Sequence, residues 1–228
     1  MLDSSTWRHV FKLDPAKALT DEQLDQVCTS GTDAIIVGGT DQITLDGVLD
    51  LLSHIRRFEV PVVLEVTNKD AISPGFDYYF IPLVLNATNK KWMMDVQHEA
   101  IKTFGPMINF DQVSAEGYCI MNPEAKAYKK AQCRLPDKED VIAYAKMTEH
   151  VFHLPFFYLE YSGTYGDVEL LKAIRPHLKE TQLIYGGGIY TLADAEKMAA
   201  YADTVVVGNS LYTDFKQAIK TVQIKQIT

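Results

Sequence analysis

The sequence predicts an α/β protein in which eight parallel strands close into a (β/α)8 barrel. Short apolar runs recur eight times along the 228 residues, and each is rich in β-branched or aromatic residues. Their apolar character is continuous rather than alternating, as in parallel strands buried on both faces. Helical patterns separate most of the runs, which is the order of a barrel. With 47% hydrophobic residues and no repeat or linker, residues 1–228 are expected to form one domain.

The predicted strands cover residues 9–13, 34–38, 62–66, 78–82, 118–121, 155–161, 183–186 and 204–208. The predicted helices cover residues 20–31, 45–58, 90–104, 136–151, 166–178 and 191–202. The first helix has a threonine cap, early acidic residues and a closing glycine. An additional segment is expected near residues 106–116, before the fifth strand.

The third crossover is shorter than the others. Only residues 67–77 separate the third strand from the fourth, and they include Ser73-Pro74-Gly75. A parallel crossover with a helix needs roughly a dozen or more residues. The sequence therefore predicts a modified TIM barrel, with the third helix missing or replaced by a loop and a gap in the helical wall.

Composition excludes several other classes. The net charge of −8 argues against nucleic-acid binding, for which a basic surface is expected. The longest apolar stretch, residues 78–85, contains a proline and is far too short for a membrane span. The three cysteines form no CxxC pair, which predicts reduced thiols and no zinc site. The first ten residues, MLDSSTWRHV, contain no apolar signal segment, so a cytoplasmic location is expected.

In such barrels the ligand lies where the strands end. The last two strands run into glycines, in LIYGGGI (183–189) and VVVGNS (205–210), and each leads into a helix. Glycine lets backbone N–H groups approach a phosphate closely, and a helix start favours negative charge. Tight turns also need glycine, but the pair of loops on the last two strands favours a phosphate site.

Charged residues at the ends of the first two strands are candidate ligands. Lys12 offers a point charge for phosphate, and Asp14, on the same face, offers an oxygen ligand for a hard cation. The alternatives are a structural ion pair or a helix cap. Thr40, in the Gly38-Gly39-Thr40-Asp41 segment, could bind magnesium through its hydroxyl or could cap a helix.

The sixth strand carries the strongest catalytic candidate. Tyr158, Glu160 and Ser162 share one face, and a glutamate in an apolar strand is costly unless it is paired. Glu160 could act as an acid, a base or a substrate anchor, whereas Tyr158 could be core. Glu65 has a similar setting in the third strand, but the sequence leaves its facing open. The six histidines form no metal-ligand spacing, and His9 is interpreted as structural.

Five segments resemble one known family: WRHVFKLDP (7–15), SGTDAIIVGGT (30–40), FYLEYSG (157–163), YGGGI (185–189) and VVVGN (205–209). They are similar to the geranylgeranylglyceryl phosphate synthases, specifically the bacterial PcrB-type heptaprenylglyceryl phosphate synthases. The resemblance covers the whole chain, with no departure at these motifs. It also agrees with the loss of the third helix.

The resemblance implies a magnesium-dependent prenyltransferase. It would transfer a heptaprenyl group from its diphosphate to the sn-3 hydroxyl of sn-glycerol 1-phosphate, forming an ether and releasing diphosphate. The implied glycerol 1-phosphate residues are Lys12, Tyr158, Leu159, Glu160, Tyr161, Ser162, Gly163, Gly188, Gly208 and Asn209. Asp14 and Thr40 would hold Mg²⁺, and Glu160 and Lys12 would be catalytic. A homodimer is implied as well.

The prenyl tail needs a long apolar groove, which is expected beside the missing helix and toward residues 90–104. Ala100 and Phe104 lie four residues apart on one helical face, and their size is expected to limit the tail. Such a lipid substrate implies access to a membrane surface without a membrane span.

Two other enzymes and a non-catalytic barrel are alternatives. A triose-phosphate-type isomerase would need an electrophilic histidine at the fourth strand, which ends Ile81-Pro82-Leu83. A phosphoribosyl isomerase or cyclase would need a second aspartate at the fifth strand, which ends Ile120-Met121-Asn122-Pro123. A phosphate-binding barrel without catalysis also fits the glycine loops.

Overall fold

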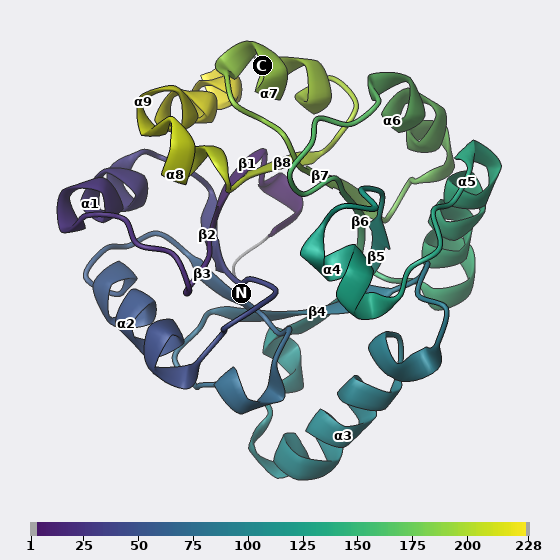
Figure 1. Cartoon of the computed structure of the whole chain (residues 1–228), viewed down its shortest axis with the longest axis horizontal. Helices are drawn as coiled ribbons and strands as arrows, with labels where there is room; N and C mark the ends of the chain where they lie inside the picture. The colour runs from purple at the N-terminus through teal and green to yellow at the C-terminus, as the bar shows by residue number, and fades with distance from the viewer. Residues whose placement is uncertain (1–3, 227–228) are drawn as a thin grey trace.

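The computed structural model describes residues 4–226 and has eight parallel strands that close into a barrel in chain order (Figure 1). This confirms the predicted fold class. The strands are β1 (His9–Leu13), β2 (Ala34–Val37), β3 (Val62–Glu65), β4 (Tyr78–Val84), β5 (Val113–Ile120), β6 (Phe156–Glu160), β7 (Gln182–Gly186) and β8 (Thr204–Val207). All eight predicted strands are present, but β4 runs two residues further than expected and β5 begins five residues earlier.

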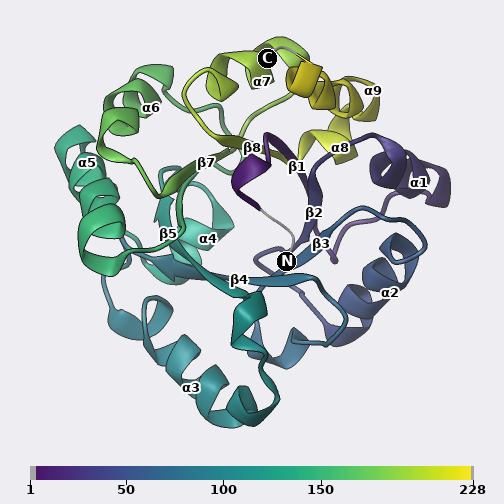
Figure 2. The same cartoon turned by 180° about the vertical axis from the view of Figure 1, so that it is seen from behind.

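The longer helices surround the barrel (Figures 1 and 2). The helices are α1 (Asp21–Thr29), α2 (Leu45–Ile55), α3 (Asp95–Phe104), α4 (Lys126–Ala131), α5 (Lys138–Met147), α6 (Val168–Ile174), α7 (Leu192–Ala199), α8 (Ser210–Thr213) and α9 (Phe215–Ala218). Capping boxes at Thr20, Asp137 and Thr191 begin α1, α5 and α7, because each side chain accepts an otherwise unpaired backbone N–H. The short helices α4, α8 and α9 were not predicted.

Three predicted helical segments are divided in the structure. The predicted 166–178 helix is α6, which ends at Ile174, followed by a 3-10 turn over Arg175–His177. The predicted 136–151 helix ends at Met147 and continues as a π-helical turn over Thr148–Phe152. The predicted 90–104 helix is a 3-10 turn over Lys90–Trp92 followed by α3. The additional segment expected near 106–116 contains a 3-10 turn at Phe110–Gln112 and the first residues of β5.

The third helix of the barrel is absent, as predicted. Between β3 and β4 the only helical element is a 3-10 turn over Lys69–Ala71. Phe76 is buried in the same connection, and its ring packs against Tyr79 at 6.0 Å. This side of the barrel is therefore covered by a loop, and α3 lies further round the wall.

The apolar core has two layers. The larger layer fills the space between the strands and the helices, and the smaller one lies inside the barrel. Trp7, just before β1, belongs to the inner layer, where its ring packs on Tyr78 and Phe80 at 6.1 and 6.2 Å. These rings fill the barrel interior near the N-terminal ends of the strands.

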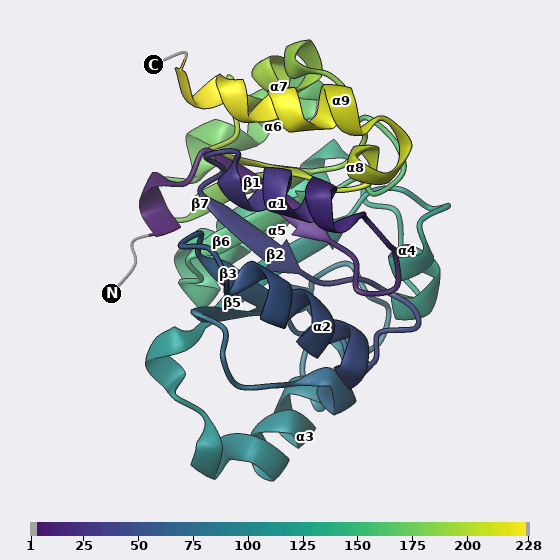
Figure 3. The ribbon, with the colours of Figure 1, turned by 90° about the vertical axis from the view of Figure 1, so that its left-hand side faces the viewer.

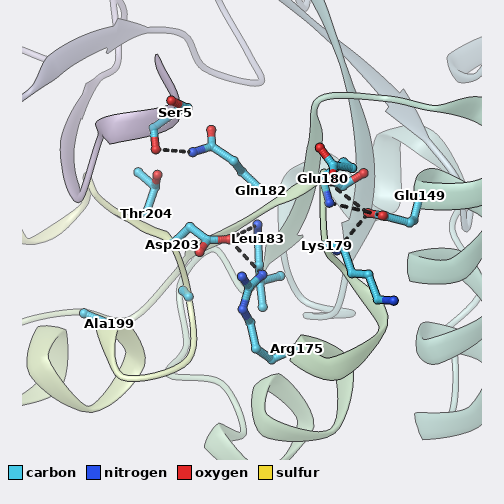
Figure 4. A network of polar contacts seen from close by, with 12 residues as sticks. Ser5, Glu149, Arg175, Lys179, Glu180, Gln182, Leu183, Ala199, Asp203 and Thr204 are labelled. Carbon is cyan, nitrogen blue, oxygen red and sulfur yellow. Dashed lines mark hydrogen bonds and ion pairs between the residues drawn. The ribbon is translucent and has the colours of Figure 1, made fainter. Parts of the chain in front are cut away.

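A polar network stabilises the N-terminal end of the barrel (Figure 4). Glu149 accepts backbone hydrogen bonds from Lys179, Glu180 and Thr181 at 2.9–3.1 Å. Burial opposes the charge, but these N–H groups outweigh it and lower the pKa of Glu149 to about 2. Because the carboxylate is ionised and fully bonded, the network holds the start of β7 and has a structural role.

His9 is also structural. It is the first residue of β1 and fully buried, and its two ring nitrogens lie 2.9 Å from the hydroxyls of Thr32 and Thr221. Burial lowers the pKa of His9 to about 3, so the ring is neutral. The interpretation of His9 as a satisfied core residue is confirmed.

The three cysteines form no disulfide. Burial raises the pKa of Cys28 and Cys133 to about 11, so both are protonated at neutral pH. Within residues 4–226 no helix is long and apolar enough to cross a membrane.

Candidate functional site

A cavity of about 640 Å³ opens at the C-terminal ends of the strands. Figure 3 shows α4 and α8 at this end, with the first and last described segments at the other. Residues from all eight strands or their following loops line the cavity. The cavity is therefore where the barrel fold leads one to expect a site.

Ten of the twelve predicted site residues line this cavity: Lys12, Asp14, Thr40, Tyr158, Glu160, Ser162, Gly163, Gly188, Gly208 and Asn209. The other two point elsewhere, because side chains alternate along β6. Leu159 is buried in the outer core, and the ring of Tyr161 packs toward Tyr185 at 6.0 Å. Only the backbone of Leu159 and Tyr161 is thus suited to a ligand contact, and their predicted roles stay predictions.

The centre of the cavity holds a buried ion pair. The ammonium of Lys12 donates to both carboxylate oxygens of Glu65, at 2.7 and 2.8 Å. Burial alone would lower the pKa of Lys12, but the charges of Glu65 and Glu160 outweigh it and raise that pKa. Glu65 faces the barrel interior, which the sequence left open. The structural ion pair weighed for Lys12 is present, inside the cavity itself.

Glu160 lies at the end of β6 beside this pair. Its Oε2 accepts a hydrogen bond from the Tyr118 hydroxyl at 2.8 Å, and the side chain is buried. Burial raises the pKa of Glu160 and outweighs the opposing effects of Lys12 and the Tyr118 hydroxyl. A carboxylate with a raised pKa is a stronger base than an ordinary one, which suits proton acceptance near neutral pH.

The hydroxyl of Tyr158, on the same face of β6, is buried and has no hydrogen-bond partner of acceptable geometry among the described residues. Its ring packs against that of Tyr118 at 4.6 Å. Gly186 makes room for Tyr158, because a Cβ at that position would overlap the hydroxyl. Tyr158 was considered either a site residue or a core residue. In the structure it is both, because it belongs to the inner core and also lines the cavity.

Glu116, on the inward face of β5, was not among the residues predicted from the sequence. It is fully buried, and neither carboxyl oxygen has a hydrogen-bond partner in the described structure. Burial raises the pKa of Glu116 well above its usual value, and the charge of Glu65 adds to the rise. The surroundings of Glu116 therefore favour its protonated, neutral form.

Replacing Glu116 by glutamine is expected to stabilise the protein more at pH 8 than at pH 5. In the wild type the folded state keeps the proton that the unfolded chain loses above the usual glutamate pKa. Stability therefore falls as pH rises, by up to ~1.4 kcal/mol per pH unit until the folded pKa is reached. Glutamine cannot ionise, so Glu116→Gln removes this loss. Urea unfolding at pH 5 and pH 8 measures the free energy of unfolding of both proteins. If the variant differs from the wild type by the same amount at both pH values, Glu116 is not held in its neutral form.

Asp14 and Thr40 lie on neighbouring loops at the mouth. Gly39 packs so closely on Asp14 that a Cβ on residue 39 would lie 2.6 Å from Asp14 Oδ1. This contact brings the loop after β2 against the end of β1. No group of three His, Cys, Asp or Glu side chains that could hold a metal occurs in residues 4–226. Asp14 and Thr40 offer one carboxylate and one hydroxyl, which fit Mg²⁺ only if water and substrate phosphates complete its shell.

The glycine loops after β7 and β8 form another wall. Gly187 and Gly188 have φ values of +136° and +60°, and a Cβ on Gly188 would overlap the backbone of Thr164 and Tyr165. These glycines therefore let the loops after β6 and β7 pack together, which is the turn chemistry considered above. They also leave Gly188 at the cavity surface, so a phosphate contact there stays a prediction.

Two further residues on this side were not predicted. The hydroxyl of Ser210 is buried and has no partner in the described structure, and Ser210 lines the cavity beside Asn209. The ammonium of Lys17 donates to Asn209 Oδ1 at 2.8 Å. An unpartnered hydroxyl and a cation beside Gly208 are what an anionic group would need.

The side of the cavity toward the missing helix is mainly apolar. It is lined by Val66, Pro82, Val84, Trp92 and Val96, and Gln97 is a polar residue in the same wall, where its side-chain nitrogen donates to the carbonyl oxygens of Pro82 and Trp92. Ala100 and Phe104 are not in the wall, although they follow Val96 on the same face of α3, at steps of four residues. Their role in limiting the tail stays a prediction.

The site defines a class of protein: a (β/α)8 barrel whose cavity at the C-terminal ends of the strands combines buried carboxyls, cations at the mouth and a mainly apolar side. Residues 2–226 match the PcrB family, to which the chain belongs.

Curated relatives of similar length agree with this. The chain is 61% identical to the heptaprenylglyceryl phosphate synthase of Oceanobacillus iheyensis, over 98% of both chains. It is 57% identical to the protein of that name from Anoxybacillus flavithermus, over 98% of this chain and 97% of the other.

Solved structures share the fold. The (S)-3-O-geranylgeranylglyceryl phosphate synthase of Thermoplasma acidophilum, solved in complex with sn-glycerol-1-phosphate, superposes with a TM-score of 0.86. The alignment covers 97% of this chain and 94% of that one, at 21% identity. At this level of identity the likeness supports the barrel fold.

Proposed function

We propose that the protein is a heptaprenylglyceryl phosphate synthase, which transfers a heptaprenyl group from its diphosphate to the sn-3 hydroxyl of sn-glycerol 1-phosphate. The support is the family and the relatives' names. The observation that carries the chemistry is the position of Glu160, whose buried carboxylate is held by Tyr118 next to the Lys12–Glu65 pair. No histidine lines the cavity among the described residues, which disfavours a triose-phosphate-type isomerase.

The reaction breaks the bond between the allylic carbon and the diphosphate oxygen. The bonding electrons leave with the diphosphate, and the sn-3 oxygen forms the new ether bond to that carbon. The hydroxyl proton goes to the Glu160 carboxylate, whose raised pKa favours uptake. Most of the remaining task is to hold the hydroxyl in line with the carbon. The glycine loops, Ser210 and Lys17 would fix the phosphate end of the glycerol substrate.

We further propose that Asp14 and Thr40 hold Mg²⁺ together with the diphosphate. A bound Mg²⁺ would neutralise the charge that develops on the leaving diphosphate. The fit rests on the contact between Gly39 and Asp14, which keeps the Thr40 loop beside the carboxylate. Because the protein alone supplies few ligands, metal and diphosphate should bind together.

Asp14→Ala is expected to raise the magnesium concentration for half-maximal turnover by about tenfold or more, because it removes the carboxylate of the proposed Asp14–Thr40 ligand pair. Binding of Mn²⁺ in the presence of a non-hydrolysable prenyl diphosphate analogue should weaken in parallel. Circular dichroism checks the fold. If both titrations match the wild type, Asp14 is not a ligand.

The prenyl tail would extend along the apolar side, from Trp92 and Val96 toward the rest of α3. Ala100→Trp is expected to shift the preferred substrate to shorter prenyl chains, because the indole would block the continuation of that wall. Mass analysis of products from mixed prenyl diphosphates measures this. An unchanged distribution would refute the placement.

A homodimer and a cytoplasmic location remain expectations for this chain. Light scattering of the purified protein tests the first. Cell fractionation tests the second, including any reversible contact with the membrane surface.

A further inference from the structure

The short helix α4 carries three lysines that differ in what they face. Lys126 and Lys130 line the cavity, and their four-residue spacing puts them on one side of the helix. Lys129 does not line the cavity and pairs with Glu124 at 2.7 Å. The helix therefore offers two cations to the cavity and one to the surrounding solvent.

Helix α4 is fastened across the mouth to the loop after β2. The Lys130 ammonium donates to the carbonyl oxygen of Thr40 at 2.6 Å, and the Lys126 ammonium lies 3.4 Å from Asp41 Oδ2. Figure 1 shows α4 inside the ring of outer helices, over the ends of the strands. Both lysines are exposed, and contacts between exposed groups of this kind are weak. A stronger anion could therefore replace both contacts.

Of the lysines that line the cavity, Lys126 and Lys130 are the pair best placed to bind a second anion. The cavity-lining lysines in the described chain are Lys12, Lys17, Lys126 and Lys130. Lys12 is neutralised by Glu65, and Lys17 is bonded to Asn209 on the β8 side. If the phosphate of the glycerol substrate binds beside Lys17, a second anion in the cavity must find its positive partners elsewhere. The remaining lysines are on α4.

Lys130 also marks the boundary between the polar mouth and the apolar side. Its ammonium bonds to Thr40 and lies 5.8 Å from the centre of the Trp92 ring. An amphiphile with an anionic head and an apolar tail would meet both surfaces at this point. The head would also lie beside the loop that carries Thr40.

We propose that Lys126 and Lys130 form the diphosphate subsite for the prenyl substrate. The two ammonium groups exchange Asp41 and the Thr40 carbonyl for diphosphate oxygens, so α4 closes over the head group when the substrate binds. They then balance the negative charge that grows on the diphosphate as its bond to carbon breaks. This inference rests on the proposed function and adds residues to its second substrate site.

The test compares Lys126→Ala/Lys130→Ala with the matched control Lys129→Ala on the same helix. Titration calorimetry measures the binding of inorganic diphosphate in the presence of magnesium, and steady-state kinetics measures both substrates. The double variant should bind diphosphate at least about tenfold more weakly and raise the KM for prenyl diphosphate by a similar factor. The KM for sn-glycerol 1-phosphate should stay within about twofold. Lys129→Ala should match the wild type in all three.

The outcomes separate this subsite from the proposed function. If the wild type forms product and the double variant binds diphosphate as tightly as the wild type, the subsite is wrong and the function stands. If Lys129→Ala weakens binding as much as the double variant, the effect is general surface charge, and the subsite is again wrong. If the wild type forms no product, the proposed function fails, while the calorimetric comparison still decides whether these lysines bind diphosphate.

Discussion

Glu160→Gln is expected to lower kcat by about 100- to 10,000-fold while the barrel stays folded. Glutamine keeps the size of the side chain and can still bond to the Tyr118 hydroxyl, but it cannot accept the proton of the sn-3 hydroxyl. Loss of a positioned base costs a factor of this order. Steady-state kinetics with both substrates at saturation measures the effect, and circular dichroism confirms the fold. A kcat close to the wild-type value would remove Glu160 from the proton transfer.

The pH profile distinguishes a base from a group that only holds the substrate. A base must be deprotonated, so wild-type kcat should fall as pH drops through the raised pKa of Glu160, and Glu160→Gln should lack that limb. The hydroxyl of Tyr118 donates to Glu160 and thereby lowers the pKa of Glu160, and Tyr118→Phe removes this hydroxyl. The acid limb of Tyr118→Phe should therefore move to higher pH. If it does not move, the limb belongs to another group.

Lys12→Met is expected to abolish most turnover and to destabilise the fold by about 3–5 kcal/mol. Removing one partner of a buried ion pair leaves the other charge uncompensated. In this chain the stranded carboxylate is Glu65, whose side chain is 3% exposed and whose two oxygens both bond to Lys12. Urea unfolding measures the loss of stability at neutral pH. A change below 1 kcal/mol would mean that the pair contributes little to the fold.

A second variant separates the structural role of Lys12 from its role with the substrate. Lys12→Met/Glu65→Gln replaces both charges, so much of the lost stability should return. Turnover should not return if the ammonium also contacts the substrate or the developing charge. Recovery of both stability and turnover would limit Lys12 to a structural role.

The barrel could be predicted because its strands are buried on both faces. Runs such as residues 34–38 and 204–208 are apolar throughout, and the short connection at 67–77 left no room for a third helix. The beginning of β5 was missed, because Ser114, Glu116 and Gly117 interrupt the apolar pattern. Helix α4 was missed because it is six residues long and has one buried residue, so no periodicity marks it.

Site residues could be predicted only where their strand or helix was itself recognisable in the sequence. Lys12 and Glu160 stand out because each is charged within an apolar strand, and both lie in the cavity. Glu116 escaped notice because its strand was not recognised over that residue. Lys126 and Lys130 escaped notice because their helix was not predicted, and the contact between α4 and the loop after β2 joins residues about 90 apart in the chain.

The most direct test of the account is whether the purified wild-type protein joins the two substrates in its cavity. The measurement incubates it with heptaprenyl diphosphate, sn-glycerol 1-phosphate and magnesium, then follows the ether product by mass spectrometry and the released diphosphate by a coupled assay. We expect heptaprenylglyceryl phosphate and diphosphate in equal amounts. A folded protein that forms no ether product from any polyprenyl diphosphate would contradict it.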